Sequence, residues 1–95
     1  MPTLLNNPEK LVAGGIIEQT HQVMKNLKSV LTNAGGSFSN VVFARVYLVN
    51  FQDFDKMNRV YERYFDSKKL PARTCIGVTG LAVGASVEID LTAKF

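Results

Sequence analysis

The residues able to do chemistry gather near the carboxyl end of this 95-residue chain, in the stretch LPARTCIGVTGLAVGASVEIDLTAKF. Arg73, Cys75 and Glu88 lie there among mostly apolar neighbours. Arginine presents a planar fork of donors that matches a carboxylate through two parallel hydrogen bonds. A glutamate can position or activate a water molecule. Arg73 and Glu88 are therefore candidates for holding a small carboxylate and a water molecule.

Cys75 is a weak candidate for a nucleophile, because a thiol needs a base to form the reactive thiolate. The only histidine, His21, lies early in a predicted helix and is expected at the surface. A second interpretation stays open, in which Arg73 and Glu88 form a structural ion pair and Cys75 is inert. The sequence contains no metal-ligand cluster, P-loop or dinucleotide fingerprint. We therefore expect no metal and no cofactor.

Two helices are expected to position these residues. Apolar residues recur at spacings of three and four from Ile16 to Leu31, and the pair Gly35-Gly36 is expected to end this helix. A second helix is predicted over roughly Asp53 to Phe65. The predicted inward stripes are Ile16, Thr20, Val23, Leu27, Val30 and Leu31 in the first helix, and Phe54, Met57, Asn58, Tyr61, Tyr64 and Phe65 in the second.

Asn58 is the polar exception on the second stripe. Burying its amide without partners would cost about 1–3 kcal/mol. Two interpretations follow: an amide satisfied by backbone groups or at the edge of the stripe, or an amide that contacts a ligand.

The stretch VVFARVYLV is rich in β-branched and aromatic residues and predicts a strand. Phe43, Arg45 and Tyr47 form one face of it, too apolar for a plain solvent face and too polar for a core. We expect another surface to cover this face. The opposite, apolar face is expected to lie under the helices and consists of Val42, Ala44, Val46 and Leu48.

The quoted carboxyl-terminal stretch is predicted to form a hairpin of two strands. Residues of one parity share a face of a strand, so pairing the apolar sets would bring Arg73, Cys75 and Glu88 together. That face would be turned away from the helices. The first fifteen residues are interpreted as a loop, with turn signals at Asn6-Asn7-Pro8 and at Gly14-Gly15. The sequence thus predicts an α+β fold, a mixed sheet with two helices on one face.

Composition bounds the class of protein. Hydrophobic residues make up 46% and charged residues 20%, which is typical of a globular domain. The net charge of +3 is scattered, which argues against a nucleic-acid partner. One cysteine permits no intrachain disulfide, and no apolar run reaches the roughly 20 residues that span a membrane. We expect a cytoplasmic protein, with the mitochondrion as the alternative.

Three stretches resemble the RidA/YjgF family of reactive intermediate imine deaminases. They are PARTC at residues 71–75 with SVEID downstream, NFQDFDKMNRVYERYF, and EQTHQVMKNLKSVLTNAGGSFSNVVFARVYLV. The resemblance implies a chorismate-mutase-like fold over residues 1–95 as one RidA-like domain. It also implies a homotrimer whose sheets close into a central barrel, with ligand clefts between subunits.

The resemblance further implies an activity, the hydrolysis of reactive enamines and imines such as 2-aminoacrylate to a 2-keto acid and ammonia. On this model Arg73 holds the substrate carboxylate and Glu88 places the attacking water. Cys75 lines the pocket, and Asn58 lies nearby at the subunit boundary. The imine carbon is already electrophilic, so this chemistry needs no metal or cofactor.

The chain also departs from the family pattern. Family members carry further N-terminal strands whose Tyr and Ser-Gly groups line the cleft, and these strands are missing here. The absence of these cleft-lining groups favours an alternative function, a non-enzymatic ligand-binding or chaperone-like trimer. A second alternative, an RNA-cleaving inhibitor of translation, has little support because the sequence lacks a basic cluster and a histidine pair.

Overall fold

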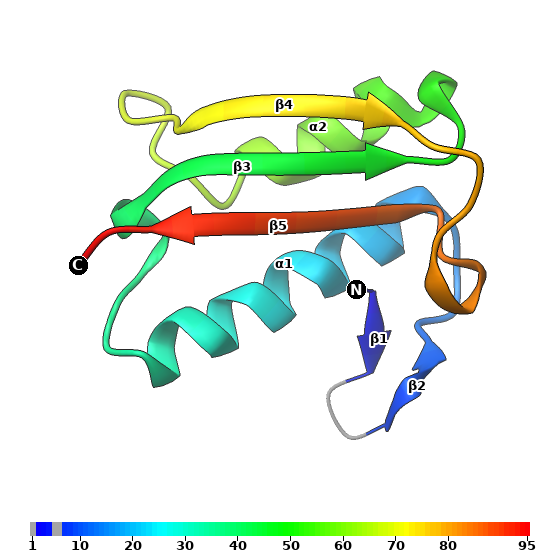
Figure 1. The fold of residues 1–95 in the computed structure, drawn as a ribbon, viewed down its shortest axis with the longest axis horizontal. Coiled ribbons are helices and arrows are strands. Elements are labelled where there is room, and N and C mark those ends of the chain that lie inside the picture. Colours follow the sequence, from blue (N-terminus) through cyan, green and yellow to red (C-terminus); the bar gives the residue numbers. More distant parts are fainter. Residues whose placement is uncertain (1, 5–6) are drawn as a thin grey trace.

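The computed structural model describes residues 2–4 and 7–95. A three-stranded mixed sheet carries two helices on one face (Figure 1), as the sequence predicts. The central strand β3 (Val41–Leu48) pairs in parallel with β4 (Ala72–Gly77) and antiparallel with β5 (Val87–Ala93). The sheet face turned away from the helices is called the open face below.

The first helix, α1, spans Ile16–Asn33 and ends as predicted. Gly35 has φ +86°, a left-handed conformation that glycine adopts without a steric penalty. The Gly36 N–H donates to the Leu31 carbonyl at 2.8 Å, which satisfies one of the last carbonyls of the helix. The glycine pair therefore stops the helix through backbone geometry.

The second helix, α2, spans Phe54–Glu62, shorter at its C-terminal end than predicted. A single 3₁₀ turn, Phe51–Asp53, leads into it, and the Asn50 side chain accepts the Gln52 N–H at 3.0 Å. Residues 63–65 form a turn, yet Phe65 still reaches the core. None of the described helices is long and apolar enough to cross a membrane.

The core lies between the sheet and the two helices. Two predicted core residues are instead exposed: Val30, at 64% exposure, and Val42, at 49%. The pairing of β3 with β5 shifts between Val41 and Phe43, and this irregularity buries Val41 in place of Val42. The fully or largely buried core residues include Val23, Met24, Leu31, Ala44, Val46, Leu48, Met57, Tyr61, Val87 and Ile89.

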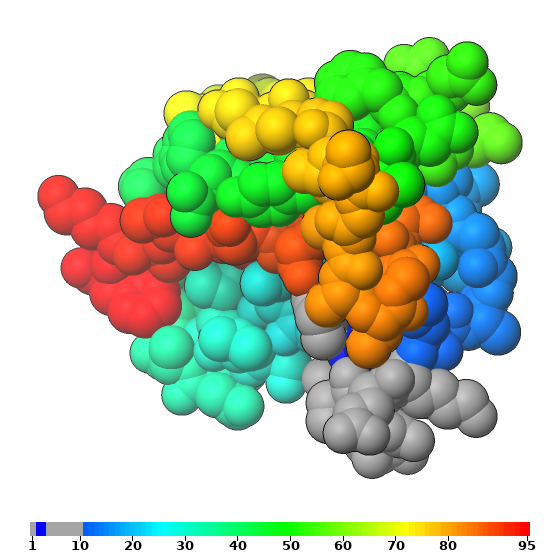
Figure 2. Space-filling model, turned by 45° about the vertical axis from the view of Figure 1, so that its right-hand side comes forward, coloured from blue at the N-terminus to red at the C-terminus, as the bar shows by residue number. Residues whose placement is uncertain are grey.

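The predicted carboxyl-terminal hairpin is wrong. β4 and β5 lie on opposite sides of β3, so they do not pair with each other. The loop between them crosses the end of the sheet, where it can be followed in Figures 1 and 2. The physical reason is the α2 crossover, which returns the chain parallel to β3 on one side and leaves the other side free for β5.

The predicted amino-terminal loop is also wrong in part. Residues 3–4 form β1 (Thr3–Leu4), which pairs antiparallel with β2 (Asn7–Leu11). Asn6 lies outside the described residues, and the bend at Gly14-Gly15 agrees with the prediction. The short hairpin is tied to α1, because the Asn26 Nδ2 group donates to the Thr3 carbonyl at 2.7 Å. Tertiary contact thus adds strand structure that local turn signals do not show.

Candidate active site

Arg73 points toward the helices from the middle of β4. It pairs with Ala44 of β3, which is fully buried under the helices, and paired residues of neighbouring strands share a face. Its guanidinium carbon lies 4.8 Å from the Tyr61 ring centroid and 5.4 Å from that of Phe54. Both rings come from α2 and attract the cation through their faces. The two rings thus favour a cation at this position.

Asn58, also on α2, joins this arrangement. Its Oδ1 accepts a hydrogen bond from Arg73 Nη1, and its Nδ2 donates to Glu62 Oε1 at 2.8 Å. The amide is half-buried and satisfied by side chains at the edge of the helix–sheet seam. Asn58 therefore orients Arg73 through a neutral group and leaves the charge of the cation in place. Among the described residues, no carboxylate lies within ion-pair distance of Arg73.

A cavity of about 220 Å³ opens beside the guanidinium, lined by Tyr61, Glu62, Leu70, Pro71 and Arg73. The Tyr61 hydroxyl is buried and has no hydrogen-bond partner among the described residues. Burial raises the pKa of this phenol, and the Arg73 cation partly opposes the shift. The hydroxyl therefore stays protonated and able to donate.

Cys75 lies two residues from Arg73 on the same, helix-facing side of β4. Burial raises the pKa of its thiol, and the Arg73 cation opposes the shift only in part. The thiol is therefore protonated near neutral pH, which is the wrong form for a nucleophile. His21 is half-buried and bonded to the Tyr64 hydroxyl at 2.9 Å.

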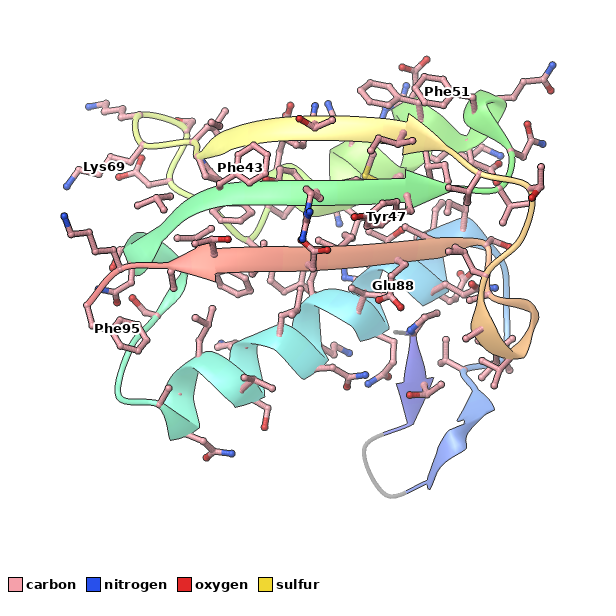
Figure 3. All side chains as sticks on the ribbon, in the orientation of Figure 1. Phe43, Tyr47, Phe51, Lys69, Glu88 and Phe95 are labelled. Atoms are coloured by element: carbon pink, nitrogen blue, oxygen red, sulfur yellow. The ribbon has the colours of Figure 1, made fainter. Side chains whose placement is uncertain are left out.

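Glu88 lies on the other side of the sheet. It pairs with Tyr47 of β3, and both residues occupy the open face that Figure 3 shows. The predicted grouping of Arg73, Cys75 and Glu88 is thus wrong within one chain. The reason is the strand order: Arg73 pairs with even-numbered Ala44, whereas Glu88 pairs with odd-numbered Tyr47, and residues of opposite parity on β3 point to opposite faces.

The open face carries its own polar group. Arg45 Nε lies 2.9 Å from Asp90 Oδ1, and the Tyr47 hydroxyl donates to Asp90 Oδ2 at 3.3 Å. These three side chains satisfy one another near the centre of the face. Phe43, labelled on the same face in Figure 3, adds an aromatic surface beside them.

The sequence pattern missed part of the site. The aromatic rings around Arg73 were interpreted only as core, and Glu62 was not singled out. Helical spacing is the sequence signal that could have pointed to Glu62. Phe54, Asn58 and Glu62 follow one another at intervals of four residues and so share a face of α2. Within the described ranges, no three His, Cys, Asp or Glu side chains gather closely enough to hold a metal ion.

Comparison with known proteins agrees with this fold. A crystal structure of yeast YEO7 superposes with a TM-score of 0.90 at 35% identity, covering 97% of this chain and 71% of that one. Escherichia coli TdcF with bound serine gives a TM-score of 0.86 at 25% identity, covering 97% and 72%. The fold is therefore that of the RidA/YjgF proteins, an α+β sheet with two helices on one face.

Sequence comparison leads to the same family. The endoribonuclease L-PSP family model matches residues 3–95. The mouse 2-iminobutanoate/2-iminopropanoate deaminase is 42% identical over 84 residues, covering 88% of this chain and 62% of that protein. The human protein of the same name is 39% identical and is covered over 61% of its length. The chain belongs to the endoribonuclease L-PSP family, which includes the RidA, YjgF and RutC proteins, and it is shorter than these relatives.

Proposed function

We propose that this protein hydrolyses small carboxylate-bearing imines and enamines, of the 2-aminoacrylate type, to a 2-keto acid and ammonia. One observation carries the proposal: Arg73 is a cation held by two aromatic rings and an amide, beside a cavity, with no carboxylate partner among the described residues. Such a group is preorganised to receive a carboxylate from outside the chain.

The reaction follows from the position of that carboxylate. Once Arg73 holds it, the adjacent imine carbon lies at a defined place in the cavity. Water adds to the carbon–nitrogen double bond, and its oxygen forms the new bond to carbon while a proton passes to nitrogen. The resulting carbinolamine expels ammonia and leaves the keto group. Fixing the carbon relative to the water supplies the positioning that speeds such a step.

The water-positioning carboxylate in this proposal is Glu88 of a second copy of the chain. Glu88 and Arg73 lie on opposite faces of one sheet, so a single chain cannot present both to one substrate. A homotrimer in which the open face of each subunit meets a neighbour would solve this problem. It would also cover Phe43, Arg45 and Tyr47.

The relatives support the substrate class. Two of them are named 2-iminobutanoate/2-iminopropanoate deaminase at about 40% identity, and TdcF holds serine, which carries a carboxylate next to an amino-bearing carbon. All are longer than this chain, so the activity of the whole relatives comes to it only as a proposal.

The test is pyruvate release from 2-aminoacrylate generated from serine, with and without the protein. We expect faster release with the wild type and a much smaller effect with Arg73→Lys, whose ammonium lacks the two-pronged fork. Equal rates with and without the wild type would overturn the proposal. Saturable serine binding without turnover would point instead to the non-enzymatic ligand-binding function.

A further inference from the structure

The wall of the cavity beside Arg73 contains charges of both signs. The guanidinium of Arg73 comes from β4, and the carboxylate of Glu62 comes from α2. Within the described ranges, no ion pair joins these two side chains. Tyr61, Leu70 and Pro71 also line the cavity and add an aromatic ring and aliphatic groups. A wall of this kind suits a small ligand that carries one positive and one negative charge.

Asn58 sets the separation of the two charges. Its Oδ1 accepts a hydrogen bond from Arg73 Nη1, and its Nδ2 donates to Glu62 Oε1 at 2.8 Å. One amide group and two hydrogen bonds therefore lie between the guanidinium and the carboxylate, which places the bonded atoms of the two charged groups at most about 8 Å apart. The two charges are not paired with each other, yet they lie near enough to bind one small ligand together.

This separation matches an α-amino or α-imino acid, in which the nitrogen and a carboxylate oxygen are about 3 Å apart. With a hydrogen bond at each end, such a molecule can bridge a gap of up to about 9 Å between two protein groups. The cavity volume of about 220 Å³ favours a ligand of this size, because pockets for drug-sized molecules are larger, roughly 300–1,000 Å³.

We propose that Glu62 is a specificity-determining residue of this site. Its carboxylate binds the positively charged nitrogen of an α-amino acid or of a protonated α-imino acid, while Arg73 holds the carboxylate of the same ligand. The inference rests on the proposed function, because it uses the same anchor at Arg73. Glu62 contacts the nitrogen from within the chain that supplies Arg73, whereas Glu88 of a second copy places the water.

The contact with Glu62 selects ligands by the charge on their nitrogen. A carboxylate beside an imine favours the protonated form, because a nearby opposite charge stabilises the charged state of a titratable group. The carbon of a protonated imine accepts water more readily than that of a neutral imine. A 2-hydroxy acid of the same shape keeps the carboxylate for Arg73 but brings no positive charge to Glu62. The site should therefore discriminate between the two kinds of acid.

The experiment titrates the full chain with L-alanine and with L-lactate, which carries a hydroxyl where alanine carries an ammonium group. The resonances of the Arg73 side-chain N–H groups and of the Asn58 amide report binding of both ligands. We expect alanine to bind about fivefold more tightly than lactate, the effect of one solvent-accessible charge pair. Equal affinities for the two ligands, or no binding of either, would overturn the inference.

Two variants of α2 locate the effect. Glu62→Gln keeps an oxygen acceptor for Asn58 but removes the charge, so the affinity for alanine should fall to that for lactate, with lactate binding changed less than about twofold. Asp55→Asn is the matched control, because it also removes a negative charge from α2 but lies about two turns away and outside the cavity lining.

Asp55→Asn should keep the preference for alanine. A preference that survives in Glu62→Gln, or that both variants lose equally, would overturn the inference. Pyruvate release is measured separately from ligand binding. A wild type that prefers alanine but releases no pyruvate would overturn the deaminase proposal alone, whereas turnover without this preference would overturn only the role of Glu62.

Discussion

Two arginines on neighbouring strands of the same sheet have opposite environments. Arg45 on the open face is already paired with Asp90 at 2.9 Å, and its side chain is 53% exposed. Arg73 under the helices contacts the rings of Phe54 and Tyr61 and is bonded to a neutral amide, beside a cavity. The charge of Arg45 is compensated inside the chain, whereas that of Arg73 is positioned but not compensated. The comparison separates a structural cation from one suited to an external anion.

The difference shows why the sequence alone does not tell whether an arginine in a strand is a structural cation or one that can bind an external anion. Both residues directly follow an alanine within a β-strand, Ala44 in β3 and Ala72 in β4. What distinguishes them is the face, because only the helix-facing arginine meets aromatic rings and a cavity wall. Exposed ion pairs contribute little to stability, so the Arg45–Asp90 pair is expected to matter mainly if another subunit covers it.

The largest effect is expected from Arg73→Lys. The ammonium keeps the charge but not the bidentate geometry, so deaminase kcat/KM should fall about a hundredfold while the fold is retained. Arg45→Lys is the matched control and should keep activity within about threefold. Pyruvate release and circular dichroism check both variants. Similar losses in the two would erase the contrast between the arginines.

Completing the sheet is expected to give the next largest effect. Fusing family-type N-terminal strands to this chain should raise turnover about tenfold, since added wall contacts hold the substrate more closely to its reactive position. It should also raise the melting temperature, because burying the β5 edge and the exposed side of α1 adds apolar contact. The same melting temperature and turnover as the short chain would show that the strands are not needed.

Asn58→Asp tests whether Arg73 must stay uncompensated. The new carboxylate would pair with the guanidinium and compete with the substrate, so KM should rise about tenfold with the protein still folded. Asn58→Ser, which keeps a neutral hydrogen-bonding group, is the control and should change KM less. Steady-state kinetics on the imine measure both, and an unchanged KM in Asn58→Asp would contradict the carboxylate-anchor role.

Asp90→Asn tests the role of the Arg45–Asp90 ion pair on the open face. If subunits meet through the open face, an uncompensated Arg45 in the interface should weaken assembly several-fold. Sedimentation at micromolar concentration should then show more monomer than the wild type does. A wild type that is itself a stable monomer would remove the basis for this interface and for a site shared between subunits.

The smallest effect is expected from Cys75→Ser. Burial holds the pKa of the thiol above its usual value, so the protonated form dominates between roughly pH 6 and 8 and no thiolate is available. Activity should stay within about threefold of wild type, and its pH profile should show no step caused by the thiol. A covalent substrate adduct on Cys75, detected by mass spectrometry, would contradict this prediction.

Much of the fold was predictable because local signals agreed with tertiary packing. The helical stripe and the Gly35-Gly36 stop gave α1, and the β-branched run gave β3. The errors at Val30 and Val42 have separate causes. Val30 faces the side of α1 that no described strand covers, and Val42 lies at an irregularity in strand pairing. Neither cause has a local sequence signal.

The sequence by itself determined the chemical groups and the family: a strand arginine followed by a cysteine, an amide on a helical stripe, a later glutamate, and stretches shared with RidA/YjgF proteins. Only the tertiary structure decided which groups meet. Alternation along a strand assigns residues to two faces, but strand order and register determine which face lies under the helices. Arg73 pairs with Ala44 of β3 and Glu88 pairs with Tyr47 of β3, which lie on opposite faces of the sheet. Arg73 therefore meets α2, while Glu88 lies on the open face.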